Sequence, residues 1–382
     1  MSSPRALYVH VPFCRSLCGY CDFYSDVLDP AAVRPLVDAL LCELAGQAAA
    51  QTLRFDTIYV GGGTPTVLPT PELHRLLSGL RDHAASPDET EFTVEANPAT
   101  VTDEVAAVLV GAGVNRVSLG AQSFDASELH LLERTHRPEQ VAETVAICRR
   151  AGIRNVNLDL IFGVPGQTPA SWLRSLRVAL ALEPQHMSCY GLTYEPGTPL
   201  RERLDAGLVS RVDEDVDAEM YELAQGTLSA GGLEQYEISN FARPGRECRH
   251  NLRYWHNEPY LGIGPAAVGF IDETRYKNIA DTAAYVRAIG EGRSPWCEQE
   301  RLPPDRRARE TAMLELRLTA GIDRRRFAER YGTDPAVLFA DAIERHVAAG
   351  LLSTGEDSLC PSAIRLTRAG LLVADTVMAD FL

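Results

Sequence analysis

Residues 8 to 25 read Tyr-Val-His-Val-Pro-Phe-Cys-Arg-Ser-Leu-Cys-Gly-Tyr-Cys-Asp-Phe-Tyr-Ser, and this stretch decides how the rest of the chain is interpreted. The apolar run at 6–11 predicts a short strand. Pro12 then ends the strand, because proline has no N–H to donate to a neighbouring strand. Three cysteines follow on the loop that leaves this strand. They are Cys14, Cys18 and Cys21.

Three thiols on so short a loop can converge on one metal centre, and soft sulfur ligands suit iron–sulfur clusters or zinc. A structural zinc site normally has four ligands, and Phe23 stands where a further cysteine could be placed. Three thiolates on a four-iron cluster leave one iron open for a small molecule. We therefore predict a cluster. The alternatives are zinc, with His10 as a further ligand, and structural cysteines without any metal.

The composition is that of a soluble globular protein of two or three domains, since the chain has 382 residues with ordinary charged and apolar fractions. The formal net charge of −15 argues against non-specific nucleic-acid binding, which needs a basic surface. The first residues do not have the pattern of a secretory signal, and no apolar run reaches the length of a membrane span. We therefore expect a cytoplasmic protein, in a compartment where thiols stay reduced.

Six further cysteines are scattered without the spacing of metal ligands, so we expect them to be ordinary small apolar residues and not a disulfide framework. They are Cys42, Cys148, Cys189, Cys248, Cys297 and Cys360. This assignment is weakest for Cys248, because it lies two residues before a histidine, His250, that is considered below.

The first half of the chain alternates strand-like runs with longer segments of helical period. Strands are predicted at 7–11, 57–61, 92–96, 116–119, 156–162 and 187–192, and helices at 31–50, 71–83, 102–111, 138–150 and 169–182. Six strands that alternate with helices predict parallel βα units, so the fold class is α/β. Periodicity does not distinguish an open sheet from a partly closed barrel.

Unusual polar and glycine-rich segments follow five consecutive strands. The first is the cysteine loop, and the others are 61–65, 95–98, 120–123 and the segment around Asp159. In parallel βα folds, ligands bind at the carboxyl ends of the strands. We therefore predict one binding edge that all five segments share.

The segment at 61–65, Gly-Gly-Gly-Thr-Pro, lets the backbone approach a ligand closely because glycine has no side chain. It has neither the Gly-Lys-Ser/Thr ending of a phosphate loop nor the spacing of a dinucleotide fingerprint. A tight turn after a buried strand is the alternative.

Four polar side chains belong to the same predicted edge. They are Glu95, Gln122, Arg134 and Asp159. A carboxylate at a strand end can accept hydrogen bonds from ribose hydroxyls, and arginine can pair with a ligand carboxylate. Glu95 as a helix-cap partner and Arg134 as a surface ion-pair donor are the alternatives. Together with the cluster loop, the four residues favour a cofactor that carries a nucleoside.

The alternation ends near residue 195, and the remainder of the chain has a different character. A helix is predicted at 213–231, and a strand-like aromatic stretch at 235–241. From about residue 302, helices are predicted at 306–317, 323–331 and 334–350, strands at 351–353 and 363–366, and a last helix at 367–382. This pattern predicts a small module of helices and a wing. Such modules often bind DNA, but the acidic balance argues against it.

Longer strings resemble a known family. The cysteine motif with Tyr20, followed by Gly-Gly-Gly-Thr-Pro, resembles the radical S-adenosylmethionine (SAM) superfamily. Four strings are similar, within it, to the oxygen-independent coproporphyrinogen III oxidase-like group. They are Tyr-Val-His-Val-Pro-Phe-Cys at 8–14, Glu-Ala-Asn-Pro at 95–98, Gly-Ala-Gln-Ser at 120–123 and Asp-Leu-Ile-Phe-Gly-Val-Pro-Gly-Gln-Thr at 159–168. The resemblance covers essentially the whole chain.

That group contains coproporphyrinogen dehydrogenases and heme chaperones. The dehydrogenases typically have a longer N-terminal lead and a further cysteine two places after the third, where this chain has Phe23. The heme chaperones carry a His-Asn-x-x-Tyr-Trp motif, which is found here as His250, Asn251, Tyr254 and Trp255. Imidazole is a common axial ligand of heme iron, and aromatic rings can pack on a porphyrin. The alternative is a buried histidine beside core aromatics.

The resemblance implies a role for each matched residue. The ligands of a 4Fe–4S cluster would be Cys14, Cys18 and Cys21. The residues that contact SAM would be Tyr8, Tyr20, Gly62, Gly63, Thr64, Glu95, Gln122, Arg134, Asp159 and, through its backbone, Thr193. The implied fold is a radical SAM partial (β/α)6 barrel with an α+β extension and a C-terminal winged-helix-like domain. The expected boundaries are 1–200, 201–300 with the heme motif, and 301–382.

The function we expect is therefore that of a heme chaperone that binds a 4Fe–4S cluster, SAM and heme. Its partners would be heme, heme-free acceptor proteins and an electron donor, with neither nucleic acid nor a membrane span. The alternative is an enzyme, a coproporphyrinogen III dehydrogenase that removes two carboxyl groups by radical chemistry. A third possibility gives the C-terminal residues a docking role. The sequence leaves open whether SAM is cleaved or only bound.

Overall fold

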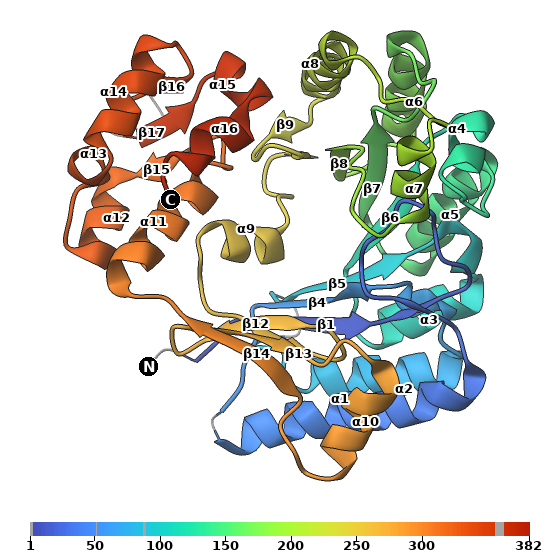
Figure 1. Cartoon of the computed structure of the whole chain (residues 1–382). Helices are drawn as coiled ribbons and strands as arrows, with labels where there is room; N and C mark the ends of the chain where they lie inside the picture. Colours follow the sequence, from blue (N-terminus) through green and yellow to red (C-terminus); the bar gives the residue numbers. More distant parts are fainter. Residues whose placement is uncertain (1–2, 51, 87–88, 356–362) are drawn as a thin grey trace. The chain divides into compact units, whose positions relative to one another are not determined.

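The computed structural model describes residues 3–50, 52–86, 89–355 and 363–382, so Cys360 lies outside the described residues. Contacts divide the chain into two compact units (Figure 1). The first contains Met1–Leu233 and Pro259–Glu300, and the second contains Glu234–Glu258 and Arg301–Leu382. Each unit is described by itself.

The first unit is built on seven parallel strands. In spatial order they are β11 (Leu261–Ile263), β1 (Ala6–Val11), β4 (Thr57–Gly62), β5 (Glu91–Ala96), β6 (Arg116–Gln122), β7 (Asn155–Phe162) and β8 (His186–Gly191). The six predicted strands are confirmed as β1 and β4 to β8. Among the described residues β8 and β11 do not pair, so the strands form an open, partial barrel.

Successive residues of these strands point to opposite faces, and the two faces differ in polarity. On β6 the apolar face carries Val117 and Leu119, which are fully buried. The other face carries Arg116, Ser118 and Gly120, and the last two line a cavity. The polar face therefore becomes the inside of the partial barrel.

Helices follow the strands and cover the apolar side of this sheet (Figure 1). They are α1 (Pro30–Ala50), α2 (Thr70–Arg81), α3 (Asp103–Gly111), α4 (Ala126–Leu131), α5 (Pro138–Ala151) and α6 (Pro169–Ala181). Their ends follow the predicted punctuation. Thr168 caps α6 by accepting from the Ser171 N–H, and Gly152 ends α5 in the left-handed region with φ 108°.

The first unit has further elements that the alternation did not predict. Short strands β2 (Phe13–Cys14) and β3 (Asp26–Val27) pair with each other on the cysteine loop, and 3-10 turns η1 (Pro65–Val67) and η2 (Pro98–Thr100) follow β4 and β5. The remaining elements are α7 (Pro199–Asp205), α8 (Glu214–Ala230), β12 (Val268–Ile271), β13 (Thr274–Asn278), α10 (Thr282–Gly290) and β14 (Trp296–Arg301). Of these, only α8 was predicted.

A buried carboxylate on α1 holds the late segment that supplies β11. Glu43 accepts hydrogen bonds from the Gly264 N–H at 2.9 Å, from Asn278 Nδ2 at 2.9 Å and from the Tyr285 hydroxyl at 2.5 Å. Burial raises the pKa of Glu43 to about 7. Residues more than 200 positions apart are thus joined at the edge of the sheet.

The second unit contains the antiparallel strands β9 (Glu234–Gln235) and β10 (Asn240–Ala242), helix α9 (Arg249–Trp255) and the C-terminal module. The module has the helices α11 (Pro304–Glu315), α12 (Arg324–Tyr331), α13 (Pro335–Leu338), α14 (Ala340–Ala348), α15 (Arg368–Leu372) and α16 (Ala374–Ala379), and the strands β15 (Ile322–Asp323), β16 (Leu352–Ser353) and β17 (Ala363–Leu366). Its strands form one small sheet in the order β15-β17-β16. This agrees with the expected winged-helix-like architecture.

Two long helices predicted for this module are each broken in the structure. The segment 334–350 is interrupted at Phe339, whose φ of −118° and ψ of 27° lie outside the helical region. The last helix is capped by Thr367 as predicted, but Val373 interrupts it with φ −124° and ψ 29°. The Phe339 ring packs 4.8 Å from the ring of Phe381, so tertiary packing outweighs helical period at this position.

No helix in the described part of the chain is both long and apolar enough to cross a membrane.

Candidate cofactor-binding site

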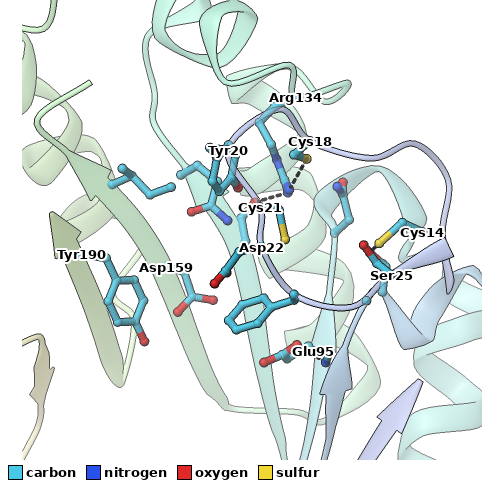
Figure 2. A pocket seen from close by; sticks show the side chains of 18 of the residues that line it. Cys14, Cys18, Tyr20, Cys21, Asp22, Ser25, Glu95, Arg134, Asp159 and Tyr190 are labelled. Carbon is cyan, nitrogen blue, oxygen red and sulfur yellow. Dashed lines mark hydrogen bonds between the residues drawn. The ribbon is translucent and has the colours of Figure 1, made fainter. Parts of the chain in front are cut away.

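A cavity of about 440 Å³ opens at the carboxyl ends of the strands of the first unit (Figure 2). Its walls come from the cysteine loop, the ends of β4 to β8 and the segments that follow them. Among the residues that line it are the predicted Cys14, Cys18, Cys21, Tyr20, Gly62, Gly63, Thr64, Glu95, Gln122, Arg134, Asp159 and Thr193. The structure thus brings together residues that are spread over 180 positions of the sequence.

The cysteine loop is fastened at both ends. Cys14 pairs with Val27 across β2 and β3, and the Cys21 N–H donates to the Cys18 carbonyl at 3.1 Å, which closes a turn. The Cys14 sulfur lies 3.6 Å from the Thr64 hydroxyl. Arg134 Nη1 donates to the Cys18 sulfur at 3.5 Å (Figure 2). All three thiols are free and partly exposed.

Burial favours the protonated form of two of the three thiols, Cys14 and Cys21, when no metal is bound. Burial raises the pKa of Cys14, and it raises the pKa of Cys21 to about 11. Metal binding would therefore have to release protons from these groups. Within the described residues, no three His, Cys, Asp or Glu side chains stand close enough together to hold a single metal ion.

The donor set fits an iron–sulfur cluster better than it fits a site with His10. Both ring nitrogens of His10 are occupied by protein groups, because the Tyr8 hydroxyl donates to Nδ1 at 3.0 Å and Nε2 donates to the Tyr24 carbonyl at 2.8 Å. The three thiols share one cavity wall with Arg134, which places a positive charge beside sulfur atoms that would be negative when ligated.

Glu95, at the end of β5, is held by groups from β4. Its carboxylate accepts from the Tyr59 hydroxyl at 2.7 Å and from the Gly62 N–H at 3.0 Å. Burial raises the pKa of Glu95 to about 7. A Cβ on Gly61 would lie 2.6 Å from this carboxylate, so the glycine gives Glu95 its space. A carboxylate in this position can accept hydrogen bonds from a diol.

The glycine-rich segment packs directly against the cysteine loop. The Gly63 and Thr64 N–H groups donate to the Val11 and Phe13 carbonyls at 2.9 and 2.7 Å. Gly62 has φ 100°, and a Cβ on Gly63 would lie 2.7 Å from the backbone of Phe13. The segment is therefore both a turn and a close contact, and it fixes the cysteine loop beside Glu95.

Asp159, on β7, anchors a polar layer inside the partial barrel. It accepts from the Ser118 hydroxyl at 2.9 Å and from Asn157 Nδ2 at 2.8 Å. His186 Nδ1 lies 2.7 Å from Asn157 Oδ1, which extends the layer to β8. Ser118 and Asn157 thus orient the carboxylate of Asp159, which faces the cavity (Figure 2).

Tyr8 is the one predicted SAM contact that does not line the cavity. Its hydroxyl is turned to His10, and burial together with the charge of Glu95 raises its pKa. Sequence reasoning also missed cavity residues, notably Tyr59, Asn97, Ser118 and Tyr190. Three of them could have been found, because Tyr59, Ser118 and Tyr190 lie two residues from other inward-facing positions of their strands.

The predicted heme motif forms α9 in the second unit. His250 is 1% exposed, and its Nε2 lies 2.8 Å from the Tyr254 hydroxyl one turn later. Asn251 and Trp255 are partly buried, and the Arg317 guanidinium lies 4.5 Å from the centre of a Trp255 ring. The motif thus has an imidazole and two aromatic rings on one short helix.

Comparison with known proteins identifies both units. Residues 8–179 match the radical SAM superfamily, and residues 302–373 match the HemN C-terminal domain. The chain is 37% identical to the heme chaperone HemW of Bacillus subtilis over 99% of both chains. It is 36% identical to that of Mycobacterium tuberculosis over 99% of this chain and 95% of the other.

One solved structure has the same fold over almost the whole chain. It is the coproporphyrinogen III oxidase HemN of Escherichia coli, a radical SAM enzyme, with a TM-score of 0.86 and 24% identity over 99% of this chain and 90% of the other. Membership in the superfamily implies a 4Fe–4S cluster and SAM as cofactors. The chain belongs to the radical SAM superfamily and, within it, to the HemW family.

Proposed function

We propose that this protein is a heme chaperone, which binds heme on its second unit, holds a 4Fe–4S cluster and SAM in its first unit, and delivers heme to acceptor proteins. The observation that carries this proposal is the His-Asn-x-x-Tyr-Trp helix α9, in a chain whose relatives of equal length are named heme chaperones. Phe23, 67% exposed at the position of a further cysteine, argues against the dehydrogenase.

The cavity residues divide the task of holding the cofactors. Cys14, Cys18 and Cys21 would ligate the cluster, which when bound supplies an open iron and one-electron chemistry. Arg134 offsets the negative charge of the ligated sulfurs and pairs with the SAM carboxylate. Gly62, Gly63 and Thr64 would lie against the methionine portion, and Tyr20 would pack near the adenine.

The ribose end of SAM would be bound by carboxylates. Glu95 would accept the ribose hydroxyls, held in place by Tyr59 and the Gly62 N–H. Gln122 and Asp159 would make the further contacts, and Asp159 is oriented by Ser118 and Asn157. Tyr8 would act outside the cavity, by donating a hydrogen bond to His10. His10 in turn donates to the Tyr24 carbonyl, which follows the cysteine loop.

Heme would be bound through His250, with Tyr254 and Trp255 beside the porphyrin. In the heme-free chain His250 Nε2 is engaged by the Tyr254 hydroxyl, so ligation of iron by this nitrogen exchanges one partner for another. Asn251 on this helix and Arg317, whose guanidinium lies over the Trp255 ring, would face the polar edge of heme. The acceptor proteins would dock on the C-terminal module.

A heme titration followed by Soret absorbance tests the proposal. We expect saturable binding, and we expect His250→Ala to weaken it at least tenfold. His346→Ala is the matched control, because His346 is a buried histidine of the same unit that pairs with Asp380. Binding that is unchanged by His250→Ala, or formation of protoporphyrinogen from coproporphyrinogen by the reconstituted protein, would contradict the proposal.

A further inference from the structure

The carboxyl end of β6 contains a strained backbone turn. The backbone of Gln122 has φ 61°. Residues other than glycine, asparagine and aspartate rarely adopt such a positive φ. The Ser123 N–H donates to the Ala121 carbonyl at 2.7 Å, which closes a three-residue turn of the rare positive-φ type. The pairing of β6 with β7 also shifts register between Gly120 and Gln122. Such a turn persists only where its surroundings hold it.

Two side chains that follow α4 hold consecutive carbonyls of this turn. Arg134 Nη2 donates to the Gly120 carbonyl at 2.8 Å, and His136 Nε2 lies 3.1 Å from the Ala121 carbonyl. Because its partner is a carbonyl oxygen, Nε2 of His136 must carry the proton. Burial and the nearby Arg134 charge lower the pKa of His136 to about 4, so the ring remains neutral near pH 7.

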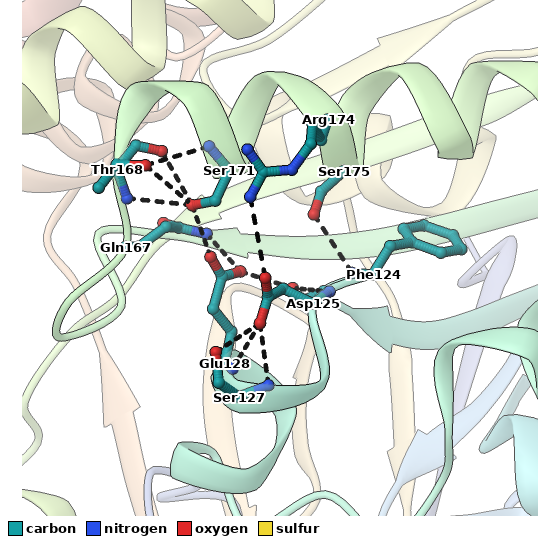
Figure 3. Close-up of polar contacts among 10 residues, drawn as sticks. Phe124, Asp125, Ser127, Glu128, Gln167, Thr168, Ser171, Arg174 and Ser175 are labelled. Atoms are coloured by element: carbon teal, nitrogen blue, oxygen red, sulfur yellow. Dashed lines mark hydrogen bonds and ion pairs between the residues drawn. The ribbon is translucent and has the colours of Figure 1, made fainter.

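A buried carboxylate on α4, Glu128, holds the other side of the turn, and Figure 3 shows it beside Gln167 and Ser171. Glu128 is 5% exposed and accepts from the hydroxyl of Ser123 at 2.5 Å, and the same hydroxyl accepts from the Asp125 N–H at 2.9 Å. Glu128 also accepts from Gln167 Nε2 at 2.9 Å and from the Ser171 hydroxyl at 2.8 Å. It therefore ties the end of β6 to the loop after β7 and to the start of α6.

We propose that His136 and Glu128 are positioning residues for the SAM site: they hold the turn at Gln122, so that the Gln122 side chain is presented to the cavity. Neither residue lines the cavity, whereas Gln122 does. The proposal rests on the proposed role of Gln122 as a SAM contact. It also gives a physical role to the side chains of Ser123 and Gln167, which both bond to Glu128.

The test is a double-mutant cycle on SAM affinity, measured by equilibrium dialysis of labelled SAM with anaerobically reconstituted protein of matched iron content. His136→Leu removes the donor and should weaken SAM binding about tenfold, as expected for loss of a buried hydrogen bond that holds strain. His136→Gln keeps an N–H donor and should restore most of the affinity. His130→Gln, an exposed histidine of α4, is the control and should have no effect.

The cycle is completed in a Gln122→Gly background. Glycine removes both the backbone strain at position 122 and the side chain that His136 would position. There His136→Leu should change SAM affinity less than about twofold, because the two effects are coupled and not additive. An equal loss in both backgrounds would mean that His136 acts only through general stability, and this would overturn the proposal. Should His136→Leu fail to fold, Glu128→Gln replaces it in the same cycle with the same expected pattern.

A second measurement uses the cofactor-free chain. Gln122→Gly should leave the unfolding midpoint unchanged or raise it, because glycine adopts positive φ without strain. Gln47→Gly, within the regular helix α1, should lower the midpoint by about 3 °C. If Gln122→Gly and Gln47→Gly lowered the midpoint equally, the backbone at Gln122 would not be strained. Wild-type protein that fails to bind SAM would refute the proposed function, whereas wild-type binding with an unaltered His136→Leu variant would refute this inference alone.

Discussion

The cavity of the first unit and helix α9 of the second unit are assembled in opposite ways. The cavity takes its side chains from one loop and five strand ends, and most of its polar groups are already paired with one another. Helix α9 carries its whole motif within seven consecutive residues, where His250 Nε2 lies 2.8 Å from the Tyr254 hydroxyl one turn later. A substitution in the cavity therefore disturbs side chains from several distant segments of the chain, whereas the residues of the α9 motif are held together by one local element.

The largest expected effect is on the cluster. Replacing Cys14, Cys18 or Cys21 singly with Ala should abolish the four-iron form, because two thiolates do not hold it in place. Iron and sulfide counts with EPR after anaerobic reconstitution measure the loss. Heme titration of the same variants sharpens the comparison, since α9 should bind heme as before. If heme binding vanished as well, the two sites would not be independent.

The next effect is on SAM binding through Glu95. Glu95→Gln keeps the shape but removes the charge that accepts the ribose hydroxyls, and it should weaken SAM binding about 30-fold, as expected for hydrogen bonds to a buried charge. Equilibrium dialysis at pH 8 measures this change. The iron content should not change, and a variant that also lost iron would show that Glu95 supports the cysteine loop as well.

The same carboxylate predicts a pH dependence. Since burial raises the pKa of Glu95 to about 7, SAM affinity should rise between pH 6 and 8 in the wild type and stay level in Glu95→Gln. The folding stability should change with pH in the opposite direction to the SAM affinity. The folded-state pKa lies above the unfolded value of 4.5, so the stabilisation from protonated Glu95 is complete below pH 4.5 and is lost as the pH rises through 7. Urea unfolding should therefore show a smaller decrease between pH 5 and 8 for the variant.

A smaller effect should come from Gly120→Ala. The added Cβ would lie 2.8 Å from Gln122 Nε2 and 3.1 Å from Arg134 Nη2, so both flexible side chains must shift. SAM affinity should fall about fivefold, corresponding to about 1 kcal/mol. Gly46→Ala is the control, because no heavy atom would lie within 4 Å of its Cβ. Equal affinities for the two variants would mean that the cavity tolerates local changes better than its crowded contacts indicate.

The smallest effect concerns α9. Tyr254→Phe keeps the ring but frees His250 Nε2 from its hydrogen bond, so heme should bind about threefold more tightly, as expected when a competing bond of modest net strength is removed. Soret titration against wild type measures it. Weaker binding would show that the hydroxyl contributes to the heme site itself, and α9 would then resemble the cavity in its dependence on paired groups.

The parts that could be predicted from the sequence are those set by local pattern. The six strands, the main helices and the shared edge follow from hydrophobic period and from glycine and proline punctuation. Strand β11 could not be predicted, because three residues near position 262 carry no period and gain their structure from pairing with β1. The breaks at Phe339 and Val373 likewise depend on packing that helical period does not contain.

The candidate site shows the same division. Its cysteines, glycines and Glu95 stand out by residue type and spacing, and the cavity brings them together. His136 was not identified, since a histidine after a short helix has no distinguishing local signal, and Tyr59 was missed because its only signal is its inward-facing position on a strand. Their importance comes from what they contact, namely the Glu95 carboxylate and the Ala121 carbonyl.

The late arrival of β11 has a consequence for the order in which the chain is made. β1, which leads directly into the cysteine loop, has one neighbour early in synthesis and gains the other only when residues 261–263 leave the ribosome. Until then the edge of β1 is open to pairing with other chains, a known route to aggregation. The nascent protein thus completes the pairing of the strand beside its metal-binding loop only after residue 263 has been made, and iron and sulfide inserted earlier would enter an incompletely folded site.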